Sequence, residues 1–305
     1  METTGGRIFS GRSPVATLLL LQFFGIIRCM SRPLLCILLL LLSIAPASAG
    51  NPFPRAAAAY LVQTPDQPGN TDWAQHAERR LPPASLTKVM TALIVLETTS
   101  PAAVATITRE AAAETGSRLK LQVGDSFLVR DLLAATLIRS ANDAAHALAV
   151  HVAGSEAAFA KKMNQRAAKL GLRNSHFVNA SGLDHPQHYS SANDLARIAQ
   201  EALKHPMFRD LVGTAQSAIK PLNRDQTYPL ETSNKLLTKY EGMLGVKTGY
   251  TSKAGRCLIA LAERDGQQVM LVLLNAPQRW ESAAAMLDRA FAQKTSHLGP
   301  YPVNQ

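Results

Sequence analysis

The sequence contains very little cysteine. Three cysteines occur among 305 residues, and two of them, Cys29 and Cys36, lie in an N-terminal segment that we expect to be removed. Cys257 then has no other cysteine with which to pair, so an intrachain disulfide framework is excluded. Because Cys257 opens the apolar run CLIAL, we interpret it as a core residue and not as a reactive thiol.

Clusters of basic residues, internal repeats and low-complexity segments are also missing. The chain carries 32 lysines and arginines against 22 aspartates and glutamates, a net charge of +10, and residues 50–305 alone keep +7. The cations are scattered, without a run of five and without the interleaved aromatic residues of a nucleic-acid-binding segment. We therefore predict no nucleic-acid partner, and expect an exported basic protein to meet an anionic cell envelope.

The apolar run that follows Met30 is shorter than the about 20 residues that a transmembrane helix needs. The sequence from Met30 reads MSRPLLCILLLLLSIAPASAG, with a basic residue at Arg32, a Leu-rich stretch over 34–44 and small residues at 47–49. This order is typical of a signal peptide, so we predict that residues 1–49 are removed after Ala49 and that the protein is soluble and exported, periplasmic or extracytoplasmic. Since a signal peptide starting at Met30 is complete, we expect translation to start there. The alternative is a long n-region or an extra anchor in residues 1–29.

Residues 50–293 are predicted to form one α/β (α+β) domain. Strand patterns occur at 56–63 and in an apolar hairpin around the Asp-Gly turn at 265–266, which follows the residues GVKTGY. Short strands are expected at 103–109 and 119–129, and helices at 85–98, at 130–152 with an interruption near Ser140, and at 155–170, 194–203 and 281–293. We expect the strands from both ends of the chain to share one sheet that the helices cover, and residues 294–305 to form a flexible tail.

The first candidate catalytic motif lies at the start of a helix, in the segment PPASLTKVMTALIVLE. Ser85 and Lys88 are three residues apart and therefore share a helix face, where the hydroxyl and the amine can touch. A serine hydroxyl becomes a nucleophile only with a base within hydrogen-bond reach. The apolar flank VMTALIVL can desolvate Lys88 and lower its pKa, which makes it a candidate base. The alternative is an ordinary helix start, with Ser85 as an N-cap and Lys88 in water.

Two further motifs complete the set. Ser140 and Asn142 stand two residues apart in a break between helical stretches, where a hydroxyl could relay a proton and an amide could bind a peptide. Lys247 and Thr248 at a strand start offer a cation and a hydroxyl to a substrate carboxylate. Gly249 after them leaves the strand edge open to another backbone. Each motif alone is weak, but their order on a helix, a loop and a strand is specific.

These motifs, and longer strings around them, resemble the penicillin-recognising serine enzymes. The strings are PPASLTKVMTA, SANDAAHALA, HFVNASGLDHPQHYSSANDLA, TSNKLL and GVKTGYTSKAGRCLIALA, within a resemblance that runs from Ala56 to Phe291. The sequence is most similar to the serine-type D-alanyl-D-alanine carboxypeptidases, the low-molecular-mass penicillin-binding proteins, in their single-domain form. The resemblance implies a β-lactamase/transpeptidase-like fold, with an antiparallel sheet covered by helices on both faces and an all-helical subregion.

The resemblance also implies a role for each motif residue. Ser85 would be the acylated nucleophile and Lys88 its general base. Ser140 would relay a proton to the leaving D-alanine amine, Asn142 would hold the substrate peptide, and Lys247 would support the proton network by its charge.

The remaining roles concern substrate binding. Thr248 would bind the terminal carboxylate, and the strand at Gly249 would receive the peptide. The backbone N–H groups of Ser85 and Tyr250 would form an oxyanion hole. For Arg279 two interpretations stay open, a further carboxylate-directed charge and a solvated arginine.

The implied activity is removal of the terminal D-Ala from peptidoglycan stem pentapeptides, in cell wall remodelling, with acylation by β-lactam antibiotics. No cofactor, metal or C-terminal membrane anchor is expected. D,D-endopeptidase action on peptidoglycan crosslinks is the alternative, and transpeptidation a further one, because the same acyl-enzyme serves all three reactions.

Three rival classes are less well supported. A class A β-lactamase would need a glutamate with a nearby Leu-Asn, and the candidates Glu156, Glu201 and Glu231 lack that context. A zinc peptidase could use Asp184, His185 and His188 of DHPQHY, but the spacing is wrong for a helix pair and a loop role is preferred. A non-catalytic envelope-binding module would not need all six motif side chains.

Overall fold

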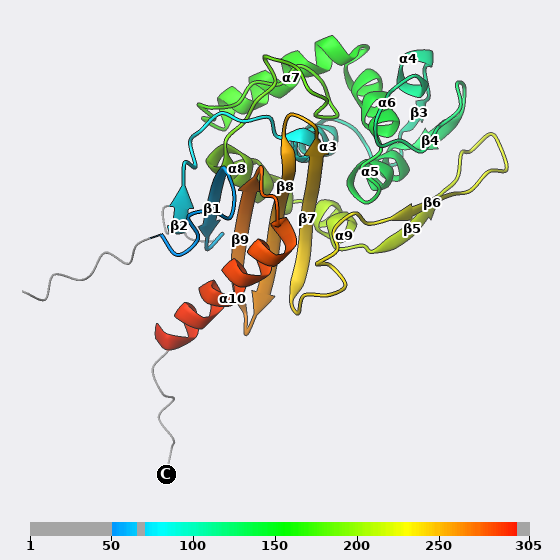
Figure 1. Cartoon of the computed structure of the whole chain (residues 1–305). Coiled ribbons are helices and arrows are strands. Elements are labelled where there is room, and N and C mark those ends of the chain that lie inside the picture. The colour runs from blue at the N-terminus through cyan, green and yellow to red at the C-terminus, as the bar shows by residue number, and fades with distance from the viewer. Residues whose placement is uncertain (1–50, 66–70, 298–305) are drawn as a thin grey trace, which may run out of the picture. The chain divides into compact units, whose positions relative to one another are not determined.

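The computed structural model describes residues 51–65 and 71–297, and the chain from Phe53 onward forms one compact unit (Figure 1). The predicted signal peptide, its cleavage site after Ala49 and the predicted start at Met30 lie outside the described residues. Within them, no helix is long and apolar enough to cross a membrane.

The centre of the unit is an antiparallel sheet of five strands in the order β2-β1-β9-β8-β7. The strands are β1 (Ala59–Gln63), β2 (Thr71–Gln75), β7 (Met243–Thr251), β8 (Gly255–Arg264) and β9 (Gln267–Leu274). β1 pairs with β9, so strands from both ends of the chain share the sheet, as predicted. β7 has a single neighbour and forms one edge of the sheet, which matters for the site described below.

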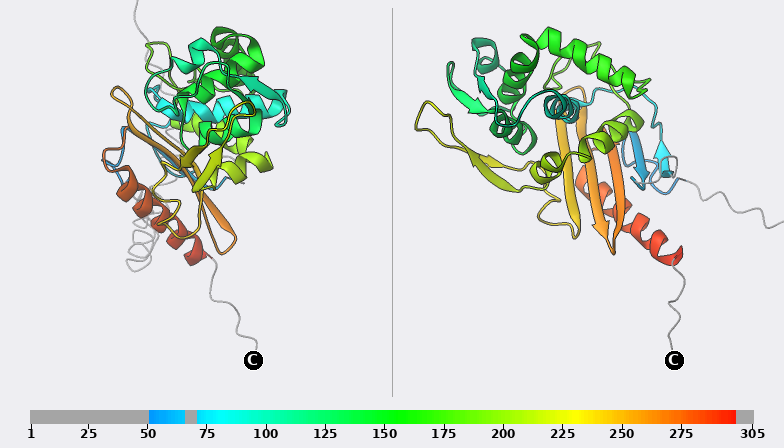
Figure 2. Two further views of the ribbon diagram at one scale, coloured as in Figure 1. Left: turned by 90° about the vertical axis from the view of Figure 1, so that its right-hand side faces the viewer. Right: turned by 180° about the vertical axis from the view of Figure 1, so that it is seen from behind.

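Apolar residues alternate along the strands and fill two separate cores. In β8, Cys257, Ile259 and Leu261 contribute to one core, while Leu258 and Ala260 contribute to the other, and all are at most 4% exposed. Successive strand residues point to opposite faces, so both faces of this sheet must be covered. α3 (Lys88–Thr98) and α8 (Ala192–Leu203) contribute to the first core and α10 (Arg279–His297) to the second (Figures 1 and 2). The predicted mixed fold with helices on both faces is confirmed.

The first core extends into a helical subregion built around α3. Its other helices are α4 (Arg109–Ala112), α5 (Val129–Leu137), α6 (Asn142–Ala153) and α7 (Glu156–Lys169). Residues Lys88 to Val95 of α3 are all buried, because α3 contacts α5, α6, α7 and α8 on different sides. A helix enclosed in this way is apolar all round, as the segment VMTALIV requires.

Some elements differ from the sequence-based expectation. The two predicted short strands are present but shorter than predicted, as β3 (Val104–Thr106) and β4 (Ser126–Leu128). The elements that were not predicted include α9 (Pro206–Val212) and the hairpin of β5 (Gln216–Ile219) and β6 (Tyr228–Glu231). α10 continues to His297, four residues past the predicted helix end at 293, so it includes residues assigned to the flexible tail. Lys294 accounts for part of this extension, since its amine contacts the Thr64 hydroxyl and lies 3.6 Å from an Asp72 carboxylate oxygen.

Candidate active site

Ser85 and Lys88 meet at the junction of two helices. Ser85 lies in a 3₁₀ turn, η1 (Ala84–Thr87), and Lys88 is the first residue of α3. Side chains three residues apart eclipse each other in a 3₁₀ turn, which brings the Lys88 Nζ to 3.0 Å from the Ser85 Oγ. Ala84 has a φ of +49°, a costly conformation for a residue with a Cβ and one that is found at functional sites.

Lys88 is fully buried and has three polar contacts. Its Nζ lies 3.0 Å from the Ser85 Oγ, 2.7 Å from the Asn142 Oδ1 and 2.7 Å from the Ser181 carbonyl oxygen. Burial lowers the pKa of Lys88 well below its usual value, the positive charge of Lys247 lowers it further, and the carboxylates of Glu114 and Asp143 oppose the shift.

The contacts of Lys88 define how a neutral amine would act. An unprotonated amine has two hydrogens, and the Asn142 and Ser181 oxygens can only accept, so they take both. The nitrogen lone pair then faces the hydroxyl of Ser85. The arrangement can therefore remove the proton of Ser85.

The second motif lies between α5 and α6. Ser140 has a φ of +62°, and its Oγ accepts a hydrogen bond of 2.8 Å from the Lys247 Nζ. Asn142 is the first residue of α6, and its amide nitrogen donates to the Thr115 carbonyl oxygen at 2.6 Å. With its Oδ1 engaged by Lys88, Asn142 holds the catalytic amine in place, whereas its predicted contact with the substrate peptide stays a prediction.

The third motif lies in the second half of the edge strand β7, not at a strand start as expected from the sequence. Lys247 and Thr248 are 1% and 5% exposed. Burial lowers the pKa of Lys247 to about 7, and the charge of Arg279 adds to the shift. The Thr248 hydroxyl hydrogen-bonds the Ser233 hydroxyl.

Gly249 allows β7 to pass very close to Ser85. A Cβ at this position would lie 3.1 Å from the Ala84 Cβ, 3.1 Å from the Pro83 oxygen and 3.1 Å from the Ser85 nitrogen. Few side chains tolerate such contacts, so glycine is needed for the close backbone approach. The strand thus runs directly beside the backbone N–H of Ser85.

Tyr250 and Arg279 flank this approach. The Tyr250 side chain is 65% exposed, and its backbone is paired with Arg256 of β8. Arg279 is the first residue of α10 and donates to the carbonyl oxygens of Gly249 at 2.8 Å and Cys257 at 3.2 Å. Arg279 is therefore partly buried and bonded to one backbone carbonyl oxygen of β7 and one of β8. The alternative of a solvated arginine does not describe it.

The histidines of DHPQHY act as hydrogen-bonding residues of a loop, as preferred from the sequence. The Asp184 carboxylate accepts from the Thr251 hydroxyl at 2.7 Å, and the His185 Nδ1 accepts from a backbone N–H. His188 Nδ1 accepts from the Val178 N–H at 3.3 Å, so its Nε2 carries the proton and donates to the Thr87 hydroxyl at 2.8 Å. Burial lowers the pKa of His188 to about 4, so the ring stays neutral near pH 7.

Two groups of the site could not be found from the sequence. The Ser181 carbonyl oxygen binds Lys88 across 93 positions of sequence, and a backbone acceptor leaves no residue signature. Ser233 touches Thr248 from the string TSNKLL, which the resemblance includes but to which no role was assigned.

Comparison with known proteins agrees with this geometry. The sequence profile of the D-alanyl-D-alanine carboxypeptidase family matches residues 48–278. A D-alanyl-D-alanine carboxypeptidase of Bacillus subtilis is 36% identical over 75% of this chain and 61% of its own length. A D-alanyl-D-alanine endopeptidase of Pseudomonas aeruginosa is 30% identical over 78% of this chain and 80% of its own.

Solved structures show the same similarity. The Streptomyces K15 DD-transpeptidase is 32% identical with a TM-score of 0.71, and the match covers 78% of this chain and 97% of that one. Penicillin-binding protein D2 of Listeria monocytogenes, solved in its ampicillin-bound form, is 31% identical with a TM-score of 0.69 over 77% of this chain and 98% of that one. The fold is that of the penicillin-binding serine enzymes. The chain belongs to the D-alanyl-D-alanine carboxypeptidase family, which confirms the resemblance seen in the sequence.

Proposed function

We propose that this protein is a serine D,D-carboxypeptidase that removes the terminal D-Ala from peptidoglycan stem pentapeptides through an acyl-enzyme on Ser85. The observation that carries the proposal is the buried Lys88 amine, 3.0 Å from the Ser85 Oγ, with two oxygen acceptors that leave its lone pair for the hydroxyl proton. A nucleophile with its own desolvated base needs neither metal nor cofactor for acyl transfer.

Substrate binding follows from the position of β7. The strand lies at the sheet edge, so its outward N–H and C=O groups are available to an extended peptide. The terminal carboxylate of the peptide would meet the Thr248 hydroxyl and the charges of Lys247 and Arg279. These two cations lie close enough for the charge of Arg279 to lower the pKa of Lys247. The two neighbouring positive charges at this end of β7 favour the binding of a free carboxylate group.

Acylation then proceeds by proton transfer and attack. Lys88 takes the hydroxyl proton as the Ser85 Oγ bonds to the scissile carbonyl carbon. The carbonyl oxygen becomes negative and lies between the backbone N–H groups of Ser85 and Tyr250. A Cβ at Gly249 would lie 3.1 Å from the Ser85 nitrogen, so the glycine lets β7 pass close enough to Ser85 for the two N–H groups to share one oxygen.

Breakdown of the tetrahedral intermediate needs a proton on the leaving amine. Ser140 would relay to it the proton that Lys88 took from Ser85, which leaves Lys88 unprotonated again, and Lys247 at 2.8 Å from the Ser140 Oγ orients and polarises the relaying hydroxyl. The C–N bond breaks, D-alanine leaves, and water attacks the Ser85 ester with Lys88 again as base. Ser85 regains its proton when the shortened peptide departs.

The same chemistry makes β-lactam antibiotics acylating agents, because a strained amide opens on the same nucleophile. The ampicillin-bound relative from Listeria supports this inference. The signal-peptide pattern of residues 30–49 supports an exported, periplasmic or extracytoplasmic location, where peptidoglycan stem peptides are found.

A product analysis tests the proposal. Purified residues 50–305 are incubated with a linear peptide ending in D-Ala-D-Ala and, separately, with crosslinked peptidoglycan fragments, and the products are identified by mass spectrometry. We expect loss of one D-alanine from the linear peptide and no loss with Ser85→Ala. Cleavage by Ser85→Ala at the wild-type rate would contradict the mechanism.

D,D-endopeptidase activity is a second candidate, favoured by the 30% identical endopeptidase of Pseudomonas aeruginosa. A crosslink presents an amide to the same acylation machinery but lacks the small D-alanine leaving group. Conversion of crosslinked dimers to monomers, without loss of D-alanine from the linear peptide, would establish it.

A further inference from the structure

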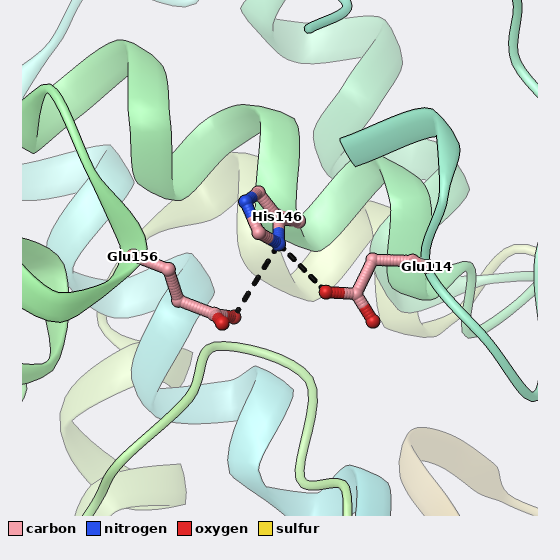
Figure 3. Close-up of side chains that lie close together, drawn as sticks. All are labelled: Glu114, His146 and Glu156. Atoms are coloured by element: carbon pink, nitrogen blue, oxygen red, sulfur yellow. Dashed lines mark hydrogen bonds and ion pairs between the residues drawn. The ribbon is translucent and has the colours of Figure 1, made fainter. Parts of the chain in front are cut away.

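A cluster of three ionisable side chains lies behind the catalytic lysine, and the mechanism above does not use it. The cluster consists of His146 on α6, Glu114 in the loop after α4, and Glu156 at the start of α7 (Figure 3). The His146 Nδ1 lies 2.7 Å from the Glu114 Oε1 and 3.8 Å from the Glu156 Oε1, and the three side chains are 11%, 13% and 23% exposed. We call these three residues the His146 cluster.

The distances within the His146 cluster fit a shared proton better than a shared metal ion. A tetrahedral zinc ion bound at about 2.0–2.1 Å would separate its two ligand atoms by about 3.3 Å. The observed 2.7 Å between Nδ1 and Oε1 is the length of a charge-assisted hydrogen bond. The Glu156 Oε1 is also engaged, because it accepts a 3.0 Å hydrogen bond from the Ala180 N–H. The Nδ1 therefore carries a hydrogen that it donates to Glu114, with the Glu156 Oε1 3.8 Å away.

The charged groups around the imidazole favour its protonated form. The hydrogen bond that His146 donates to Glu114 raises the pKa of His146, burial opposes the rise, and the charges of Glu156, Glu114 and Glu110 add to it. The charge of Glu110 acts on the ring from α4, and the Arg118 guanidinium donates to the Glu114 carbonyl oxygen.

Each carboxylate of the His146 cluster is connected to an acceptor of Lys88 through one neighbouring residue. On one side, Glu114 precedes Thr115, whose carbonyl oxygen binds the Asn142 amide at 2.6 Å, and the Asn142 Oδ1 binds Lys88 at 2.7 Å. On the other side, Glu156 binds the Ala180 N–H at 3.0 Å, and the next carbonyl oxygen, of Ser181, binds Lys88 at 2.7 Å. Asn142 and His146 also lie one turn apart on α6. The His146 cluster thus joins the two segments that direct the amine of Lys88 towards Ser85.

We propose that His146 is a positioning residue for the acylation step, whose imidazolium, bonded to Glu114 and facing Glu156, fixes the two acceptors of Lys88. Loss of this proton leaves two buried carboxylates that repel each other, and the two segments separate. The proposal rests on the role of Lys88 proposed above. It predicts that acylation needs Lys88 without its proton and His146 with its proton, so the two groups limit the rate at opposite ends of the pH range.

The first test is the rate of Ser85 labelling by a fluorescent penicillin as a function of pH, in wild type, Glu114→Gln and Glu110→Gln. Removing the Glu114 charge takes away the partner that raises the pKa of His146, so the basic limb of the profile should move to lower pH. The acid limb should move the same way, because Glu114 also raises the pKa of Lys88. At pH values above the moved basic limb we expect labelling to fall about tenfold, the effect of one lost charge-assisted hydrogen bond.

Glu110→Gln is the matched control, since it removes an exposed carboxylate from the neighbouring helix without breaking the bond to His146. Its limbs should stay close to those of wild type. Lys247, whose pKa is about 7, contributes to the profile of every variant and so does not affect the comparison. A Glu114→Gln profile that is lower at every pH, with unmoved limbs, would overturn the proposal, because a purely structural residue gives that result.

An NMR titration of the wild type gives a second test that needs no variant. We expect the His146 ring to titrate above about 6.5, the value of a free histidine, and the Ala180 amide to shift with the same midpoint. A His146 pKa at or below that value, an Ala180 amide that does not follow, or stoichiometric zinc that is lost in His146→Leu would each overturn the proposal. Failure of the proposed function would give a different result from failure of the His146 proposal. If the proposed function is wrong, the penicillin does not label wild type at any pH, while the NMR titration still shows whether the Ala180 amide follows the titration of His146.

Discussion

Replacing Lys88 by methionine should separate its chemical role from its packing role. Methionine has a similar length, fills most of the buried volume and has no amine. General-base catalysis contributes about 10²- to 10⁴-fold to a rate, so we expect Lys88→Met to slow acylation of Ser85 by this factor, about 3–5 kcal/mol in the barrier.

The stability effect of Lys88→Met should be smaller than the catalytic one. The Asn142 Oδ1 and Ser181 carbonyl oxygen, each 2.7 Å from the amine, would lose a donor, at about 1–3 kcal/mol apiece. The variant also no longer desolvates an amine, the largest cause of the lowered Lys88 pKa, and this gain offsets part of the loss. The variant should therefore fold and be measurable.

The assay is the rate of fluorescent penicillin labelling across pH, with thermal unfolding in parallel. On the acid limb, wild-type labelling should rise with pH as Lys88 loses its proton, at pH values well below 10.5, the pKa of an unperturbed lysine. Lys88→Met should lose this rise, whereas Lys162→Met, an exposed substitution on α7, should keep it. Labelling by Lys88→Met within about threefold of wild type would refute the assignment of Lys88 as the base.

Three further predictions follow from the geometry. Gly249→Ala puts a Cβ 3.1 Å from the Ser85 nitrogen. The rate of acylation measured by stopped flow should therefore fall by about tenfold or more, with a modest change in Tm. An unchanged rate would count against the close approach of β7 to Ser85. The pKa of His188 is lowered to about 4 in the folded state, so protonation of His188 disfavours folding as the pH falls from about 6.5 to about 4. Chemical denaturation should show that up to about 3 kcal/mol of unfolding free energy is lost over this pH range, and His188→Gln should remove this contribution to the loss. Cys257 is fully buried and its pKa is raised to about 11, so thiol reagents should leave the activity of the native protein unchanged, and inactivation would contradict a core role.

Most of the sheet could be predicted from the sequence because its signals are local, but β2 (Thr71–Gln75), which begins within the turn-rich segment TPDQPGNTD, was not predicted. Two continuous apolar runs on either side of the Asp-Gly turn at 265–266, whose residues both have positive φ, define the β8–β9 hairpin without reference to the rest of the chain. The 3.6-residue pattern likewise placed α7 and α8 within two residues of their observed starts. The hairpin β5–β6 was missed because its residues are mostly exposed and follow no clear apolar alternation.

The catalytic residues could be selected from the sequence, but their partners could not. Ser85 and Lys88 are neighbours on one helical turn, so their contact is encoded in their spacing. Asn142 was expected to face the substrate, yet Lys88 and Thr115 engage both ends of its amide, a result of helix packing that no spacing rule contains. The His146 cluster joins three elements for the same reason, and nothing in the run DAAHALA distinguishes a histidine that positions Lys88 from one that only fills space.

The central claim is that Ser85 becomes acylated, and a covalent trap tests it most directly. Purified protein is treated with benzylpenicillin, quenched in acid, digested with trypsin and analysed by mass spectrometry. The account predicts one penicilloyl adduct, located on Ser85 within residues 81–88, and no adduct in Ser85→Ala. An adduct on another residue, or its persistence in Ser85→Ala, would contradict the account.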